Sequence, residues 1–249
     1  MEIVVLKMLF LVGLSVAQMQ IGKYVYVPLP LSWDKAQLHC RKYFTDLAAI
    51  TDQREENRLK NVTTGKVYGM FWIGLYFDNE YWMWSGGGRA TDIPWASDQP
   101  NDIQHQKGGF VCWSKCNWPG WHNYPSSRQL PSLCINLMVM KTTETWEQAL
   151  QHCRAKHTDL TSLTSETEQL LVLSKIEHDD DITERVWIGL RFLGDSWLWV
   201  DGNPLRYEAW AEGGDQDHLC PVQRRCGAFT KQGVWENWDC QDRLNFICD

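Results

Sequence analysis

Short apolar runs and amphipathic stretches follow one another along this chain in an order that occurs twice. The run at 71–75 reads Phe-Trp-Ile-Gly-Leu, and the run at 186–190 reads Val-Trp-Ile-Gly-Leu. A short apolar run that contains a glycine is typical of a buried core strand to which another backbone comes close. The pattern therefore predicts one central strand in each half of the chain.

Tryptophan positions indicate that the two halves are copies of one module. Twelve of the fifteen tryptophans form matched pairs, at positions 33/146, 72/187, 82/197, 84/199, 95/210 and 121/235. Because both copies keep them at one spacing, we expect these side chains in the cores. Trp113, Trp118 and Trp238 stand outside the pattern. An internal repeat of this kind predicts two modules with the same fold.

The first copy begins with a predicted strand at 23–27 that is rich in aromatic and β-branched residues. Ser32 can cap a helix that places Trp33, Ala36 and Cys40 on one face. A second helix follows Thr51 and is polar almost all round, which predicts a surface position. Residues 85–109 then form a long stretch of turn-forming and polar residues. Loops of this length in compact domains are usually functional.

The second copy repeats these elements with clearer helix starts. After an opening strand at 136–141, Thr145 with Gln148 fits a capping box, and Ser165 with Glu168 fits another. Between the two copies there is no glycine, proline or low-complexity segment. We therefore expect the modules to abut without a flexible linker.

Length, charge and motifs limit the functional classes. The 249 residues allow two domains of roughly 110 residues each, a size that can bury its own core. The net charge is −7 and no basic run occurs, which argues against nucleic acid and polybasic membrane binding. No Gly-x-Ser-x-Gly, His-Glu-x-x-His or phosphate-loop motif is present. The sequence therefore predicts no enzyme.

Residues 1–17 have the pattern of a secretory signal peptide, with Lys7, an apolar run at 8–16 and small residues before the cleavage point. The apolar run is shorter than the ~20 residues that span a membrane, and no other segment could span one. We expect a mature chain that begins near Gln18, is secreted and holds its nine cysteines in disulfides. Asn61 begins a glycosylation sequon, expected on an exposed helix end or loop.

The cysteines align between the copies. Spacing pairs the positions 40/153 and 134/248, and counting back from the tryptophans at 121 and 235 pairs 112 with 226. Ser126 takes the place that Cys240 has in the second copy. Cys116 and Cys220 have no counterpart.

These landmarks together resemble the C-type lectin domain. They are Ser-Trp-Asp-Lys-Ala-Gln-Leu-His-Cys, Thr-Asp-Leu-Ala-Ala-Ile, Trp-Ile-Gly-Leu, Trp-Met-Trp-Ser, Gln-Pro-Asn, Trp-His-Asn and a terminal Cys. The resemblance covers the mature chain as two tandem domains, 22–135 and 136–249. It implies an α+β fold in which each domain has two helices, short antiparallel sheets and a long loop region that carries the ligand site.

The resemblance also implies three disulfides, which are Cys40–Cys134, Cys153–Cys248 and Cys226–Cys240. Cys112, Cys116 and Cys220 then remain. A link between Cys112 and Cys116 and a link between Cys116 and Cys220 both stay open. The thiol left over is either free or paired between chains, and the second case would give a disulfide-linked oligomer.

Sugar-binding members of the family hold one Ca²⁺ with a proline-centred triplet, an acid two residues before the third-from-last cysteine, and a Trp-Asn-Asp triplet. In the first domain the resemblance assigns carbohydrate and weak Ca²⁺ binding to Gln99, Asn101 and Asn123. A plain loop turn, with Pro100 cis for shape alone, is the alternative that the charge of the ligands favours for this triplet. The acid position falls on Phe110, and Asp102 is the nearest carboxylate that could substitute. Since affinity follows the number of carboxylates, we expect Ca²⁺ binding in the millimolar range or weaker.

The second domain has lost the pattern. Gly214, Asp215 and Gln216 occupy the triplet, and the acid position holds Arg224, a fixed cation. We expect no family-type Ca²⁺ site there, and we interpret Asp215, Asp217 and Glu236 as a solvated face.

The sequence thus predicts a secreted, non-enzymatic recognition protein that binds carbohydrate through the first domain. Two alternatives stay open. One is Ca²⁺-independent binding of a protein ligand, and the other is a fragment of a larger endocytic receptor.

Overall fold

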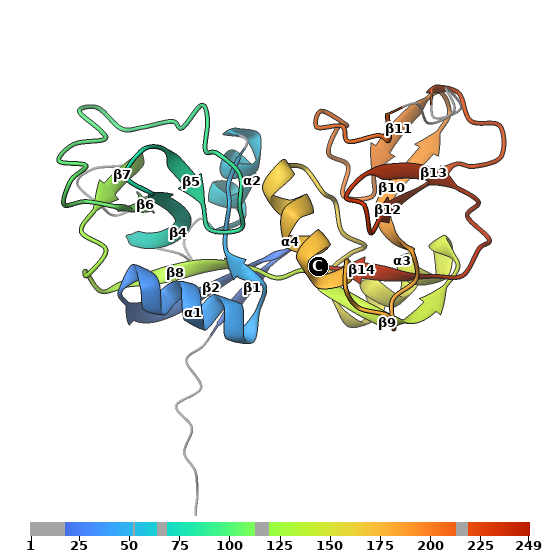
Figure 1. The fold of residues 1–249 in the computed structure, drawn as a ribbon, viewed down its shortest axis with the longest axis horizontal. Coiled ribbons are helices and arrows are strands. Elements are labelled where there is room, and N and C mark those ends of the chain that lie inside the picture. The colour runs from blue at the N-terminus through green and yellow to red at the C-terminus, as the bar shows by residue number, and fades with distance from the viewer. Residues whose placement is uncertain (1–17, 52, 64–68, 113–119, 213–218) are drawn as a thin grey trace, which may run out of the picture.

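Two domains lie side by side in the computed structural model, each with two helices and a mixed sheet (Figure 1). The structure describes residues 18–51, 53–63, 69–112, 120–212 and 219–249. The expected signal peptide at 1–17 lies outside this part of the chain. The predicted α+β class and the predicted repeat are confirmed.

Domain 1 is built around a sheet in which the first and last long strands are neighbours. Its elements are β1 (Met19–Ile21), β2 (Tyr24–Leu31), α1 (Trp33–Tyr43), β3 (Asp46–Leu47), α2 (Gln53–Thr63), β4 (Met70–Phe77), β5 (Trp82–Trp84), β6 (Gly108–Cys112), β7 (Gly120–Tyr124) and β8 (Leu130–Ile135). The strand order is β1-β2-β8-β4-β6-β7, with β3 beside β8 and β5 beside β4. The two ends of the domain meet because β2 pairs with β8, and β4 runs parallel to β8 on its other side.

Domain 2 repeats this plan. Its elements are β9 (Met138–Glu144), α3 (Trp146–Lys156), α4 (Glu166–Ile176), β10 (Arg185–Leu193), β11 (Ser196–Trp199), β12 (Cys226–Thr230), β13 (Trp235–Trp238) and β14 (Leu244–Cys248). The order is β13-β12-β10-β14-β9, with β11 beside β10. The opening strand begins slightly later than predicted, and only a very short connection separates it from β8.

The central strands β4 and β10 are buried over most of their length, as the apolar runs predicted. Their glycines lie where the backbone leaves no room for a side chain. The Gly74 amide donates to the Ala48 carbonyl at 2.8 Å, and a Cβ on Gly74 would lie 3.0 Å from the Leu47 carbonyl oxygen. Gly189 has the same contact with the Leu160 carbonyl in domain 2.

The matched tryptophans tie helices to strands in the same way in both domains. The indole of Trp33 donates to the Ile73 carbonyl at 2.9 Å, and that of Trp146 donates to the Ile188 carbonyl at 2.9 Å. All the matched tryptophans are buried except those at 82, 95 and 210, which are half-buried. The prediction of core positions is therefore confirmed for most of them.

The helix starts were predicted with mixed success. The capping box of Thr145 and Gln148 is confirmed. Ser32 is the N-cap residue of α1, but its side chain accepts no hydrogen bond. The second predicted box is only half formed. The Ser165 hydroxyl accepts from the Glu168 amide at 3.3 Å, but the Glu168 carboxylate accepts from the Thr164 amide at 2.8 Å instead of the amide of the cap residue. The reason is an ion pair between Glu168 and domain 1, described below.

The three disulfides implied by the family resemblance are present, and they are Cys40–Cys134, Cys153–Cys248 and Cys226–Cys240. The first closes a loop with a sequence separation of 94, which contributes on the order of 4–5 kcal/mol in the chain-entropy model. Cys112 is also disulfide-bonded, to a partner outside the described residues. Cys220 is free and exposed, so the link between Cys116 and Cys220 is not formed.

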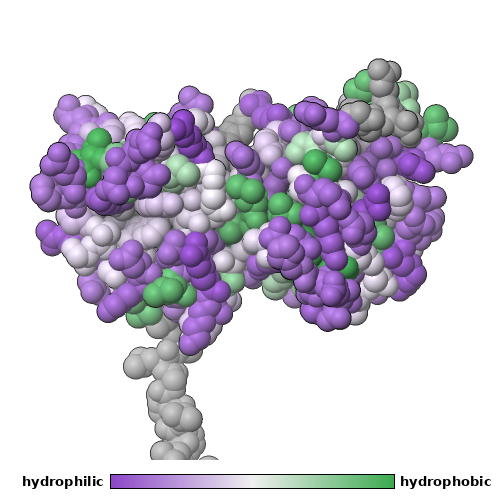
Figure 2. Space-filling model, viewed as in Figure 1, coloured by the Kyte–Doolittle hydropathy of each residue, from purple (hydrophilic) through white to green (hydrophobic). Residues whose placement is uncertain are grey.

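Helix α4 lies between the two domains and contacts both (Figure 1). A Cβ on Gly86 of domain 1 would lie 2.7 Å from Leu171 Cγ, and Thr167 donates to the Gly87 carbonyl at 2.9 Å. Lys175 donates to the Leu137 carbonyl at 2.7 Å. Apolar side chains gather over α4 between the domains (Figure 2). The helix is apolar on more than one face because it packs against two domains.

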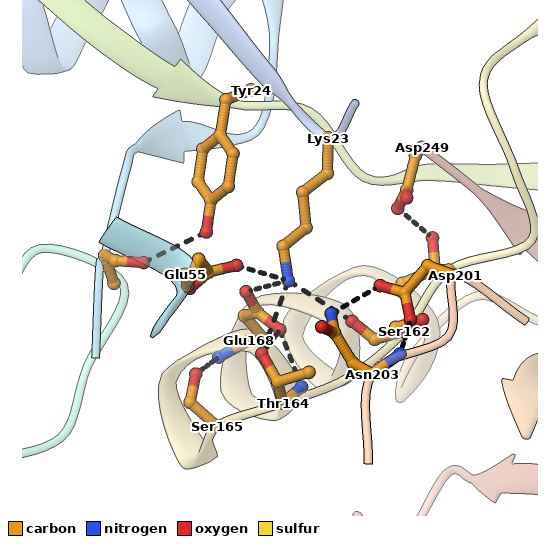
Figure 3. Close-up of polar contacts among 12 residues, drawn as sticks. Lys23, Tyr24, Glu55, Ser162, Thr164, Ser165, Glu168, Asp201, Asn203 and Asp249 are labelled. Atoms are coloured by element: carbon orange, nitrogen blue, oxygen red, sulfur yellow. Dashed lines mark hydrogen bonds and ion pairs between the residues drawn. The ribbon is translucent and has the colours of Figure 1, made fainter. Parts of the chain in front are cut away.

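A buried ion cluster completes the contact between the domains (Figure 3). The Lys23 ammonium, in the turn between β1 and β2, lies 2.6 Å from Glu168 Oε1 of α4 and 3.3 Å from Glu55 Oε1 of α2. Burial opposes the charge of Lys23, but the two carboxylates outweigh burial and raise its pKa. The ammonium therefore stays charged and bridges the second helices of both domains.

One side of α2 faces solvent, as predicted for this polar helix. Glu56 and Leu59 are nevertheless buried, because they point toward the domain core. Asn61 is exposed in the last turn. This is the kind of position expected for the glycosylation sequon, and glycosylation itself stays a prediction.

Candidate functional site

The long loop of domain 1 joins β5 to β6 and folds against β7. Its middle contains the Gln-Pro-Asn triplet, and the Gln99–Pro100 peptide is cis. Asp98 and Asp102, on either side of the triplet, have positive φ angles of 63° and 40°. The triplet is thus presented at the surface between two sharp turns of the backbone.

One asparagine of β7 holds this loop in place. The Asn123 side chain is 2% exposed, and its Oδ1 accepts from the Asn101 amide at 3.0 Å. Its Nδ2 donates to the Gln106 carbonyl at 3.1 Å and to the Asn101 carbonyl. The Asn123 amide donates to Gln99 Oε1 at 3.4 Å. The structure therefore brings Gln99, Asn101 and Asn123 together, with the Asn123 side chain engaged in shaping the loop.

Domain 2 contains the same clamp. Asn237 lies two residues after Trp235, as Asn123 does after Trp121, and its Nδ2 donates to the Arg224 carbonyl at 3.2 Å. The side-chain amide holds the end of the long loop in both copies. This duplicated role needs no metal ion.

The sheets show that Cys112 is not the counterpart of Cys226, so the alignment by spacing is wrong at this point. The central tryptophan of β4 faces Phe110 in β6, whereas that of β10 faces Ala228 in β12. Since the tryptophans correspond, Phe110 corresponds to Ala228, and Gly108 corresponds to Cys226. The spacing failed because the hairpin that joins β6 to β7 is longer than the one in domain 2.

This correction moves the acid position of domain 1 from Phe110 to Gln106, which corresponds to Arg224. Phe110 is buried and stacks on His122 with ring centroids 5.1 Å apart, so it belongs to the core. Gln106 lies at the end of the long loop, where its carbonyl accepts from Asn123. Gln106 is therefore a site residue that the sequence analysis missed. Gly109 and Gly227 are the sequence signal that could have found it. Aligning these two glycines places Gln106 opposite Arg224.

Two carboxylates flank the triplet, Asp98 before it and Asp102 after it, and a neighbour engages the second. Asp102 Oδ1 lies 2.7 Å from His105 Nδ1, and both side chains are exposed. Four of the family positions (Gln99, Asn101, Gln106 and Asn123) carry amides, and the fifth holds His122, which is buried and stacks on Phe110. Ca²⁺ takes six to eight oxygens, and its affinity depends on carboxylate charge. This donor set does not fit a Ca²⁺ site of the family type.

His, Cys, Asp and Glu are the side chains that usually hold metal ions in proteins. Over the residues that the structure describes, no group of three or more His, Cys, Asp or Glu side chains could hold a metal ion. The predicted triplet of domain 2 at 214–216 and Asp217 lie outside those residues. The Glu236 carboxylate pairs with the Arg185 guanidinium instead of facing a metal site.

Comparison with protein families gives a match over both domains. The Lectin C-type domain matches residues 29–136 and 142–249. The chain belongs to the C-type lectin family. C-type lectin domains are a non-enzymatic family that often binds Ca²⁺, and the absence of an enzymatic motif agrees with this membership. Disulfide-bonded lectin domains also indicate an extracellular protein.

The relatives that this C-type lectin chain matches are much longer proteins. Human lymphocyte antigen 75 is 24% identical over 88% of this chain and 14% of the relative's length. The bovine secretory phospholipase A2 receptor is 24% identical over 90% of this chain, and rat C-type mannose receptor 2 is 23% identical over 88%. This chain spans 17% of each of those two receptors. It is thus similar to a part of each of these longer proteins.

Some solved structures are also similar to part of this chain. Human lithostathine is 27% identical, covers 45% of this chain and 80% of its own, and has a TM-score of 0.39. The carbohydrate-recognition domain of the mouse scavenger receptor C-type lectin is 27% identical over 45% of this chain and 86% of its own, also with a TM-score of 0.39. In the described part of this chain, every helix is too short or too polar to cross a membrane.

Proposed function

We propose that this protein is a secreted recognition protein that binds carbohydrate through the long loop of domain 1 without requiring Ca²⁺. The observation that carries the proposal is the cluster of amides around the triplet, held in place by Asn123 with no carboxylate at the family positions. Side-chain amides donate and accept hydrogen bonds at once, which suits the hydroxyl groups of sugars.

The surface of the loop favours a glycan over a protein ligand. Protein interfaces are usually anchored by aromatic and apolar side chains. In the described residues, the large exposed hydrophobic side chains lie outside 85–107. The loop instead presents Asn101, Asp102 and His105 to solvent. A polar, hydrogen-bonding surface of this kind is typical of sugar recognition.

Secretion and the ligand class are both part of the proposal. The signal-peptide pattern at 1–17 supports export, and the name of one relative, C-type mannose receptor 2, makes mannose a natural first probe. Since the relatives are much longer, a place within a larger endocytic receptor is the alternative, and Ca²⁺-independent binding of a protein ligand is another.

Titration calorimetry on the disulfide-bonded chain tests the proposal. Mannose and galactose glycopolymers are titrated first with EDTA and then with Ca²⁺ up to about 5 mM, the weak end of the range for oxygen sites. We expect saturable binding of one glycan in both buffers, with no separate heat for Ca²⁺. Binding that requires Ca²⁺ would contradict the metal-free mechanism.

A pair of variants locates the binding face. Asn101→Ala removes an exposed amide of the triplet, and the clamp remains because Asn123 contacts only the Asn101 backbone. We expect glycan affinity to fall about tenfold, which is the loss of one or two hydrogen bonds. Asn57→Ala removes an exposed amide of α2 and should leave the affinity unchanged. Equal affinities in both variants would place the glycan elsewhere.

A further inference from the structure

Domain 2 presents a cationic surface in a chain whose net charge is −7. Arg224 and Arg225 immediately precede β12, and both are exposed. Neither has an acidic partner within 4 Å in the part of the chain that the structure describes. Arg225 donates from Nε to the Pro221 carbonyl at 3.0 Å and lies over the Phe192 ring. The positive charge at this point of the surface is therefore not neutralised by a salt bridge.

Arg224 shares an aromatic ring with a second arginine. Its guanidinium carbon lies 5.1 Å from the centre of the Trp238 ring, and that of Arg185 lies 4.2 Å from the same ring. The charge of Arg185 is balanced by Glu236, whose carboxylate lies 2.5 Å from Arg185 Nε. Among the described residues, no carboxylate pairs with Arg224. Trp238 is one of the tryptophans outside the repeat, and it is half-buried instead of buried in the core.

Three constraints fix the backbone around Arg224. The Cys226–Cys240 disulfide begins two residues later, Cys226 faces Trp238 in the sheet, and Asn237 holds the Arg224 carbonyl at 3.2 Å. The ring and the arginine therefore meet in a defined place before any ligand arrives. Such preorganisation reduces the entropy that a ligand must lose on binding.

The position of Arg224 carries an uncharged side chain in domain 1. By the register of the two sheets, Gln106 corresponds to Arg224 and Tyr124 corresponds to Trp238. The two copies therefore differ at this position, where domain 1 has an amide and domain 2 has a guanidinium with no acidic partner among the described residues. This difference in charge indicates a different ligand chemistry in domain 2.

We propose that the surface formed by Arg224, Trp238 and Arg185 binds an oxyanion, a sulfate ester or carboxylate, of an acidic glycan without Ca²⁺. A guanidinium presents a planar fork that matches two oxygens of such a group. The indole edge next to it supplies apolar surface for the ring of the sugar. The choice of a glycan over an acidic protein segment rests on the carbohydrate recognition proposed for domain 1.

The test measures binding of a sulfated heparin tetrasaccharide to the intact chain in EDTA, with the desulfated tetrasaccharide as the reference ligand. We expect saturable binding of the sulfated form that weakens as salt is added. Arg224→Gln should lower the affinity about tenfold or more, since a charge-assisted hydrogen-bond pair is lost. Arg224→Lys keeps the charge but loses the fork, and it should have a smaller effect.

Arg128→Gln is the matched control, because Arg128 lies 5.5 Å from the Tyr124 ring, the counterpart of Trp238 in domain 1. We expect this variant to bind the sulfated tetrasaccharide as the parent does. Equal binding by Arg224→Gln, or equal affinity for the desulfated form, would overturn the proposal. Binding of a polyglutamate peptide but not of the tetrasaccharide would overturn the glycan assignment. Neutral-glycan binding sensitive to Asn101→Ala, measured on the same samples, reports separately on domain 1.

Discussion

Asn123 and Asn237 show how one side chain can fix a recognition loop. Each lies on a strand at the edge of its sheet and donates to a carbonyl at the end of the long loop. Asn123 also accepts from the Asn101 amide, so its amide group is paired on both sides. A buried amide with these partners contributes on the order of 1 kcal/mol per hydrogen bond, and its removal leaves buried backbone groups unpaired.

Asn123→Ala should therefore loosen the loop and lower the free energy of unfolding by about 1–3 kcal/mol. Chemical denaturation measures the loss of stability, and hydrogen exchange at residues 99–107 measures the loosening. Asn123→Asp should be worse, since it places a negative charge against the carbonyls of Asn101 and Gln106. Unchanged exchange at 99–107 in both variants would show that other contacts hold the loop.

One added carboxylate should raise the affinity of the domain 1 loop for Ca²⁺. Asn101 is exposed, so Asn101→Asp adds a charge at a family position without burying it. We expect weak saturable Ca²⁺ binding in this variant and a smaller signal or none in the parent, because affinity depends on carboxylate number. Calorimetry in parallel with Asn57→Asp, which adds the same charge on α2, separates a site from a general charge effect. An identical response from both variants would refute the expectation.

Among the elements, helices α2 and α4 occupy the same place in the repeat but have different surroundings. Helix α2 is mostly polar, whereas α4 buries Leu171, Val172 and Ile176. The sequence predicted both helices correctly. It could not show that α4 packs against the other domain, because an apolar helix face does not identify its partner. Lys23 also could not be recognised, since Glu55 and Glu168 are far from it in sequence.

The fold was predictable because the core tryptophans, the central glycines and the helix cysteines recur at fixed spacing. The site was predictable only in part. Spacing counted back from Trp121 and Trp235 wrongly placed the acid position at Phe110. The count passes through the hairpin that joins β6 to β7 in domain 1 and β12 to β13 in domain 2, and this hairpin has a different length in each domain. The register of β6 against β4 is fixed by a close contact between Gly109 and Leu75. A Cβ on Gly109 would lie 2.6 Å from Leu75 Cβ. A contact between strands of this kind cannot be read from residue counts.

The packing of α4 on domain 1 makes a testable prediction. A Cβ on Gly86 would overlap Leu171, so Gly86→Ala should destabilise the docked pair by about 1–3 kcal/mol. Leu171→Ala should also be destabilising, because it leaves a cavity. The double variant should lose less than the sum, since the new methyl group fills space that leucine vacates. Thermal unfolding of all four proteins checks this, and additive losses would mean that the two sites do not touch.

At the scale of the whole molecule, a buried charge cluster joins the domains. Lys23 pairs with Glu55 of its own domain and Glu168 of the other, while Asp249 lies near it at the end of β14 (Figure 3). Asp249 also lines a cavity of about 280 Å³ with Ile21 and Leu59 of domain 1. Removing Lys23 alone would leave carboxylates buried without a partner, which is strongly destabilising in proteins.

This cluster predicts that the domain pair is more stable at mildly acidic pH. Burial raises the pKa of Asp249 to about 7, with Glu168 and Asp201 adding to the rise, while Lys23 and a hydrogen bond from Thr161 oppose it. An unfolded aspartate titrates near ~3.9. Between about pH 4 and pH 7, Asp249 is therefore protonated in the folded state and ionised in the unfolded state. Its contribution to stability grows as pH falls below 7 and is lost as pH rises through 7.

Asp249→Asn isolates this effect from other groups. The pKa of His39 and that of His157 are both lowered by burial, which opposes the trend below about pH 6.5 in parent and variant alike. Between about pH 8 and pH 5, the parent should gain roughly 2–3 kcal/mol relative to the variant. Denaturant unfolding at a series of pH values measures this difference. Parallel stability curves would mean that Asp249 titrates normally.

The fixed contact between the domains has a consequence for ligands that carry more than one epitope. In Figure 1 the long loops of both domains lie along the same upper side of the molecule. Because α4 and Lys23 hold the domains together, the two faces keep a constant separation. A polymer whose neutral and acidic units repeat at that separation would bind the second face at a high effective concentration. The pair would thus measure the spacing of a glycan as well as its chemistry.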